Sequence, residues 1–175
     1  MNEMLQAMLH RRSVRKYTGE PIPAEKLELV LQAALTSASG KAAYPCEFIV
    51  VEDRATLDKL AGCRTGASKM LEKAGAAVVV LGDETKTDTI IEDCSIALTN
   101  MHLMADSLGL GSCWIQGRLR PAPDGRTTEE YLRNVLGFPE HCRLEAILSL
   151  GIPDEHPAPR VREELKYEKV HREKY

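Results

Sequence analysis

The segment from Met4 to Gly19 contains no acidic residue and four cationic ones, Arg11, Arg12, Arg15 and Lys16. The whole chain has 26 acidic and 23 basic residues, so this segment differs in charge from the rest. On a helix Arg11 and Arg15 would share one face, where like charges cost roughly 0.2–0.5 kcal/mol per pair. Together with the hydroxyl of Ser13, the arginine side chains suit a phosphate, because each charge-assisted hydrogen bond to a phosphate oxygen is worth about 1.5–3 kcal/mol. A solvated basic face on a terminal helix is the alternative.

The composition of the chain is that of an ordinary globular protein. Its 175 residues, 43% hydrophobic and 28% charged, fit one domain with one core. A net charge of −3 argues against a general nucleic-acid binder, which would be basic as a whole. No apolar run reaches the roughly 18 residues of a membrane span, and the start lacks the apolar stretch of a signal peptide. We therefore expect a cytoplasmic protein with neither a nucleic-acid nor a membrane partner.

The cysteines and histidines do not point to a metal or a disulfide framework. The five cysteines include no CxxC pair, which favours reduced thiols. The five histidines are far apart in the sequence, so no metal site is predicted. Nucleotide fingerprints are also missing: there is no GxxxxGK[ST] loop, and Gly109-Leu110-Gly111 leads into a predicted strand rather than out of one. A phosphate at the arginines would therefore be held in a different kind of fold.

Hydrophobic periodicity predicts an alternation of helices and strands. Apolar residues recur every three or four positions in residues 24–35 and 87–108, which predicts two helices, the second central to the core. Thr127 and Glu130 fit a capping box for a helix that ends at Gly137. Apolar runs predict strands at residues 48–51, 76–81, 112–115 and 144–150. Strands and helices intermix, so the class is α/β or α+β.

The last 22 residues differ from the rest of the chain. Residues 154–175 carry six acids and six bases with few apolar side chains, so they cannot make their own core. They are either disordered or an arm over a neighbour, to which Val161, Leu165, Tyr167, Val170 and Tyr175 would give buried contacts. We expect residues 1–153 to form a single domain.

Four segments in register resemble the FMN-dependent nitroreductase family. Residues 11–17, Arg-Arg-Ser-Val-Arg-Lys-Tyr, are similar to its opening phosphate motif. Residues 37–40, followed by Pro45 and residues 48–51, resemble its small-residue loop and first strand. Residues 93–115 resemble the central helix and following strand, and Gly151-Ile152-Pro153 with residues 160–162 resembles its C-terminal basic pair. The resemblance covers essentially the whole chain.

The resemblance implies an α+β fold, with a mixed sheet flanked by helices, and an intertwined homodimer whose C-terminal arms (residues 154–175) pack on the partner subunit. FMN would lie at the dimer interface. Its phosphate and ribityl end would contact the first basic cluster and the tail, and the partner chain would line the ring with its small-residue loop. Gly117 would allow the backbone to approach the reactive edge of the ring. The cofactor-binding residues implied in this way are Arg11, Arg12, Ser13, Arg15, Ser37, Ala38, Ser39, Gln116, Gly117, Arg160 and Arg162.

The reaction implied by the resemblance is a ping-pong transfer. NADH or NADPH gives a hydride to the flavin and leaves, and a flat acceptor such as a nitroaromatic, quinone or flavin takes its place; no catalytic side chain is required. Three positions depart from the family pattern, with Ala42, Tyr44 and Cys46 where Asn, Gln and Trp are usual. They keep two alternatives open. One is another flavin reaction on this fold, such as dehalogenation, azoline oxidation or flavin fragmentation, and the other is a non-catalytic flavin-binding protein.

Overall fold

One four-stranded sheet organises the computed structural model, which describes residues 2–175. Its strands are β1 (Cys46–Val51), β2 (Ala76–Asp83), β3 (Gly111–Gln116) and β4 (Cys142–Gly151). They are ordered β1-β2-β4-β3, and each neighbouring pair is antiparallel. The resemblance implied a mixed sheet. Among the described residues, the parallel pairing consists of a single bridge between Ser13 and Ser112. Strands and helices make an α+β fold, as the resemblance implied.

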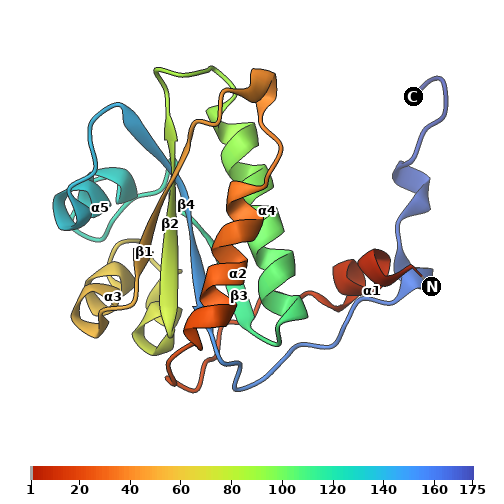
Figure 1. Cartoon of the computed structure of the whole chain (residues 1–175), viewed down its shortest axis with the longest axis horizontal. Coiled ribbons are helices and arrows are strands. Elements are labelled where there is room, and N and C mark those ends of the chain that lie inside the picture. Colours follow the sequence, from red (N-terminus) through yellow and green to blue (C-terminus); the bar gives the residue numbers. More distant parts are fainter. Residues whose placement is uncertain (1) are drawn as a thin grey trace.

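Helices cover both faces of the sheet (Figure 1). Helices α2 (Ala24–Leu35) and α4 (Ile90–Ser107) cover one face, and α3 (Arg54–Ala61) and α5 (Thr128–Leu136) cover the other. In β2, Val78 and Val80 pack in the hydrophobic core between the sheet and helices α2 and α4. Val79 and Leu81 pack in the core on the opposite face, against α3 and α5. A strand buried on both faces has no polar face, which explains why this one is a continuous apolar run.

The predicted helix signals are present at the ends of α5 and α4. The Thr127 side chain accepts from the Glu130 N–H and the Glu130 carboxylate accepts from the Thr127 N–H, which makes the expected capping box. Gly137 ends this helix at φ 74°. Helix α4 starts at Ile90, three residues later than predicted. Helix α3, whose Asp53 cap accepts from the Thr56 N–H at 2.8 Å, was not predicted. Two short 3-10 helices, η1 (Gly40–Ala42) and η2 (Lys69–Lys73), complete the body.

Helix α1 (Glu3–His10) and the C-terminal arm lie to one side of the body (Figure 1). Helix α1 has no buried residue. The arm runs from residue 154 beside α1 and contains η3 (Arg162–Glu164) and η4 (Tyr167–Lys169). Within residues 2–175, no helix combines the length and hydrophobicity needed to cross a membrane.

The expectation that Arg11 and Arg15 share a helix face is wrong. Helix α1 ends at His10, and Arg11 is already its C-cap. The chain then runs against the edge of β3, where the Val14 N–H donates to the Ser112 carbonyl at 2.9 Å. Tyr17 is buried, and its hydroxyl donates to the Val14 carbonyl at 2.9 Å. These contacts hold the basic segment in an extended conformation, so its side chains diverge.

Candidate functional site

A cleft of about 410 Å³ opens where α1, the basic segment, α4 and the arm meet. Its lining residues are Met8, Arg11, Ser13, Thr99, His102, Leu103 and Arg160. Two guanidiniums and two hydroxyls are therefore close together, and no acidic side chain is among the described lining residues. Two cations facing one cleft repel each other, and an anion between them would remove that cost.

A neutral histidine orients Arg11 in this cleft. The Nη1 atom of Arg11 lies 3.1 Å from Nε2 of His102, and Nδ1 of His102 lies 2.5 Å from the Ser112 Oγ. Burial and then the charge of Arg11 lower the pKa of His102 from 6.5 to about 4, so the ring is neutral at neutral pH. The hydrogen-bond network then assigns the proton to Nδ1, which donates to Ser112, while Nε2 accepts from Arg11.

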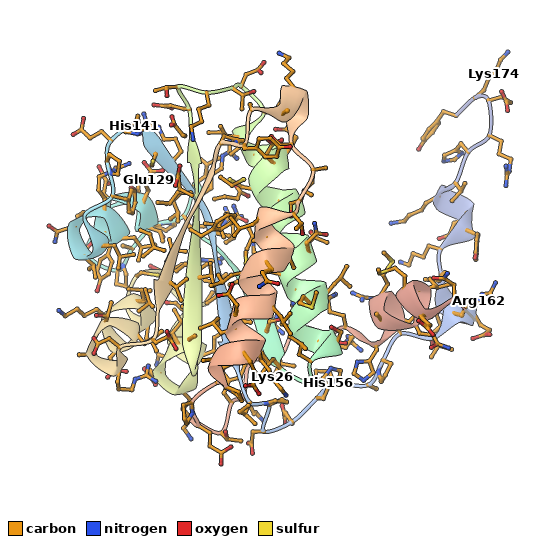
Figure 2. All side chains as sticks on the ribbon, in the orientation of Figure 1. Lys26, Glu129, His141, His156, Arg162 and Lys174 are labelled. Carbon is orange, nitrogen blue, oxygen red and sulfur yellow. The ribbon has the colours of Figure 1, made fainter. Side chains whose placement is uncertain are left out.

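The arm supplies the second cation of the cleft. The backbone N–H of Arg160 donates to the Leu9 carbonyl at 2.8 Å, and its Nη1 donates to the Arg11 carbonyl at 3.2 Å. Burial lowers the pKa of Arg11, and the charge of Arg160 lowers it further. Arg162 lies farther along the arm, in η3, and is not among the lining residues (Figure 2). Arg160 is thus the arm cation that reaches the cleft.

The other two predicted arginines of the basic segment point elsewhere. Arg12 donates from Nη1 to the Ala158 carbonyl on the arm. Arg15 lines a separate cleft of about 290 Å³ that also contains Lys16 and Lys69. Of the residues expected at a phosphate, the structure therefore brings together Arg11, Ser13 and Arg160, and it does not place Arg12, Arg15 or Arg162 in their cleft.

The small-residue loop is tied to α4 by a buried carboxylate. Oδ2 of Asp93 accepts from the Ser39 hydroxyl at 2.5 Å, and Oδ1 accepts from the Gly40 N–H at 3.2 Å. Ser39 Oγ in turn accepts from the Tyr44 N–H at 2.8 Å. Lys41, Ala42 and Tyr44 all have positive φ, at 53°, 54° and 45°, a conformation that costs energy for residues with a Cβ. The Asp93 contacts hold this strained turn in place.

The small-residue loop does not face the Arg11 cleft within one chain. Ser37, Ala38 and Ser39 line a small cavity of about 60 Å³ together with Tyr44 and Asp93. Asp93, which binds the Ser39 end of the loop, is nine residues and about 14 Å along α4 from His102, whereas Ser37 accepts from Asn100, nearer to His102. The expectation that a partner chain supplies this loop to the flavin is compatible with this separation and stays a prediction.

Gly117 packs closely against a side chain of its own chain. A Cβ at this position would clash with the Leu144 side chain, which occupies the space beside it. Its N–H donates to the Glu145 carbonyl at 3.2 Å, and the approach of this backbone to a flavin ring stays a prediction. Gln116, at the end of β3, accepts from the Trp114 indole N–H at 2.8 Å.

Three buried polar residues near these features were not predicted to contribute. Asp93 and His102 lie in the apolar stripe of α4, at 2% and 7% exposure, and a polar residue at a core position of a helix is the signal that could have revealed them. Glu145, on β4 beside Gln116, is 5% exposed and its Oε2 has no hydrogen-bond partner among the described residues. Burial raises the pKa of its carboxyl.

Known proteins match this chain over its whole length, in sequence and in fold. The model of the nitroreductase family matches residues 8–63 and 62–152. An FMN-dependent nitroreductase from Clostridium difficile R20291 superposes with a TM-score of 0.94 at 40% identity, covering 98% of this chain and 99% of its own. A relative from Archaeoglobus fulgidus, provisionally named NADH dehydrogenase/NAD(P)H nitroreductase, is 35% identical over 100% of both chains. A nitroreductase of provisional assignment from Desulfovibrio desulfuricans, solved with FMN, is 25% identical with a TM-score of 0.80, covering 100% and 99%.

Full-length matches of this kind identify the class of the protein. The chain belongs to the nitroreductase family.

Proposed function

We propose that the protein is an FMN-dependent oxidoreductase that uses NADH or NADPH to reduce a flat acceptor such as a nitroaromatic, a quinone or a flavin. The observation that carries this proposal is the cleft formed by Arg11, Ser13 and Arg160, which gathers cations and hydroxyls with no acid among its described lining residues. The names of related proteins, among them FMN reductase [NAD(P)H] from Bacillus subtilis and oxygen-insensitive NADPH nitroreductase from Salmonella typhimurium, support the same reaction class.

The donor set of the cleft fits the phosphate of FMN. A phosphate monoester carries close to two negative charges, and Arg11 and Arg160 supply two positive ones. Ser13 and Thr99 add hydroxyl donors at the same cleft. His102 stays neutral, so it can hold the Arg11 guanidinium without adding a third charge. The residues present therefore match the group in charge and in hydrogen-bonding type.

Each protein group has a binding or orienting role. FMN, when bound, would supply the hydride chemistry between the nicotinamide and the acceptor. Arg11, Ser13 and Arg160 would bind its phosphate, and His102 would orient Arg11. Asp93 holds the small-residue loop in one conformation, so that a ring packed against this loop would meet a rigid surface. None of these roles requires a side chain to transfer a proton, and a ping-pong sequence of nucleotide and acceptor follows if both use one face of the ring.

We propose further that the chain acts as a homodimer in which residues 154–175 pack on the partner and residues 1–153 form the domain. The arm exposes Val161, Tyr167 and Val170 at 49%, 65% and 62%. A groove of about 570 Å³ between α1, α2 and α4 is lined with apolar side chains, including those of Met4, Met8 and Met104. Single exposed apolar residues are common, but an extended arm and an apolar groove in one chain favour burial against a second copy.

Two-substrate steady-state kinetics test the reaction. With FMN-loaded protein, varied NADH or NADPH and varied quinone or nitroaromatic, we expect parallel double-reciprocal lines, because the nucleotide leaves before the acceptor binds. Intersecting lines would contradict the ping-pong order. Bound FMN that neither nucleotide reduces would instead favour one of the alternatives, another flavin reaction or a binding role, for which the departures at Ala42, Tyr44 and Cys46 are the structural reason.

The molar mass in solution tests the dimer. Light scattering of the purified full chain should give twice the 19.4 kDa of one chain. A mass of 19.4 kDa at micromolar concentration would contradict the exchanged arm.

A further inference from the structure

Two histidines and an aspartate from three separate elements meet beside the arm. His10 is the last residue of α1, Asp106 lies in the last turn of α4, and His156 is on the arm, below α1 in Figure 2. One ligand atom from each lies within 4.8 Å of the others. Asp106 is the central residue: its Oδ2 is 2.7 Å from Nδ1 of His10 and its Oδ1 is 3.2 Å from Nε2 of His156. Its side chain is only 6% exposed.

The hydrogen bonding of His156 leaves its second nitrogen facing another acceptor. Nδ1 of His156 lies 2.8 Å from the Pro157 carbonyl, which can only accept, so Nδ1 carries the proton. In the neutral ring Nε2 is then a lone pair, and it points at a carboxylate oxygen of Asp106 at 3.2 Å. Two acceptors at this distance repel each other unless a positive charge lies between them. That charge is either a proton on Nε2 or a metal ion.

One feature around the cluster is common beside metal-binding histidines. Histidine ligands commonly donate their other ring N–H to a backbone carbonyl, which fixes the tautomer, and His156 does so toward Pro157. The rings of His10 and His156 are stacked, with centroids 4.6 Å apart and an angle of 22° between their planes, so one ring would have to rotate out of the stack for both to ligate a single ion. His10 can donate its Nδ1–H to Asp106 as a neutral ring, so the alternative to an ion is one additional proton, on His156.

We propose that His10 Nδ1, His156 Nε2 and the Asp106 carboxylate bind a divalent transition-metal ion, with Zn²⁺ the best match. Two imidazoles and one carboxylate are a set that zinc takes in tetrahedral sites with water as the fourth ligand, at about 2.0–2.2 Å from each atom. Imidazole ligands also select against Mg²⁺ and Ca²⁺, which prefer oxygen. The three ligand atoms lie within 4.8 Å of one another, and binding an ion would require the His10–Asp106 pair, now at 2.7 Å, to open and the two rings to turn toward one point.

A metal at this place would fasten the arm to the body next to the proposed phosphate cleft. His10 precedes Arg11, and His156 precedes Arg160 by four residues. The arm is already held here by bonds from the Arg160 N–H to Leu9, from Arg160 Nη1 to the Arg11 carbonyl and from Arg12 to Ala158. Metal binding would add a link between α1, α4 and the arm, and it would fix the path by which Arg160 reaches the cleft. The role we assign to the ion is structural.

Equilibrium dialysis against micromolar Zn²⁺ tests the proposal on the purified full chain loaded with FMN. We expect wild-type protein to hold one more zinc per chain than the His156→Ala variant, and the affinity of the variant for that zinc to fall at least 10-fold. His171→Ala is the matched control, because His171 is an exposed histidine of the arm that contacts Tyr175 and lies outside the cluster. This variant should bind zinc like wild type. Zinc held by thiols stays in every variant, so only the difference between proteins counts.

A second readout separates a structural ion from a surface histidine. In wild type, zinc should slow proteolytic cleavage of residues 154–175, and it should have no such effect in the His156→Ala variant. Equal zinc content in wild type and His156→Ala would overturn the proposal. So would a wild type that binds no zinc, in which case a proton on His156 holds the contact with Asp106. The FMN content of each protein is measured in parallel, so a failure of the metal site is distinguishable from a failure of the flavin site.

Discussion

Replacement of Arg11 by alanine should weaken FMN binding by about 10- to 150-fold. Arg11 is one of two guanidiniums that line the phosphate cleft, and its orientation is fixed by the 3.1 Å contact with His102. The change removes a charge-assisted bond to the phosphate, worth about 1.5–3 kcal/mol, and each 1.4 kcal/mol is a factor of ten in Kd. The second cation, Arg160, remains, so binding should be reduced rather than abolished.

Flavin titration followed by fluorescence measures this loss, with Lys16→Ala as the matched control. Lys16 belongs to the same segment and carries the same charge, but its Nζ pairs with Glu155 at 3.0 Å on the surface. Its removal should change the Kd for FMN less than twofold. Riboflavin, which lacks the phosphate, should bind Arg11→Ala and wild type equally well. An unchanged Kd for FMN in Arg11→Ala, or an equal loss of riboflavin affinity, would refute the assignment of the cleft.

Three further predictions concern buried titratable groups. The pKa of His102 is about 4 in the folded chain against 6.5 ordinarily, so the unfolded chain takes up the proton first as the pH falls. The free energy of unfolding, measured with urea, should therefore fall by about 3 kcal/mol between pH 6.5 and pH 4, and it should fall less in His102→Gln. Burial raises the pKa of Glu145, so the folded chain loses stability as the pH rises from 4.5 to the raised pKa and the carboxyl ionises. Glu145→Gln should therefore stabilise the chain at neutral pH by about 1 kcal/mol, measured by thermal unfolding. Cys94, 3.7 Å away, lowers the pKa of half-buried Cys46, whereas burial raises that of Cys63 to about 11, so mass spectrometry should find Cys46 alkylated before Cys63.

The elements with strong local signals could be predicted from the sequence. The capping box at Thr127 and the glycine at residue 137 define α5 at both ends, and both are local interactions of a few residues. The apolar runs of β2 and β4 predicted strands because both faces are buried. Helix α3 was missed because it is short and packs only a few apolar residues, Leu57, Leu60 and Ala61, against the body. Its formation depends on tertiary packing rather than on propensity.

The residues of the site could be predicted by type, but their grouping could not. Arg11, Arg12 and Arg15 are equivalent as sequence, and only the end of α1 at His10 and the burial of Val14 and Tyr17 decide which of them enters the cleft. Arg160 joins Arg11 through an arm contact 149 residues away in the sequence. Contacts of that separation leave no local pattern.

The same limit applies to the histidine cluster. His10 and His156 are separated by 146 residues, so their spacing indicated no metal site, yet the fold places both rings against Asp106. The buried carboxylate of Asp93 that ties down the small-residue loop is a similar case, since its partners Ser39 and Gly40 lie on another element.

The absorbance spectrum of the FMN-loaded protein, followed during anaerobic addition of NADH and then of NADPH, tests the central claim most directly. The proposed function predicts that flavin absorbance remains with the protein through gel filtration and bleaches with one or both nucleotides. It also predicts that the colour returns when a quinone is added. A protein that retains no FMN after saturation, or whose bound FMN stays oxidised with both nucleotides, would contradict the assignment as an NAD(P)H-dependent flavin oxidoreductase.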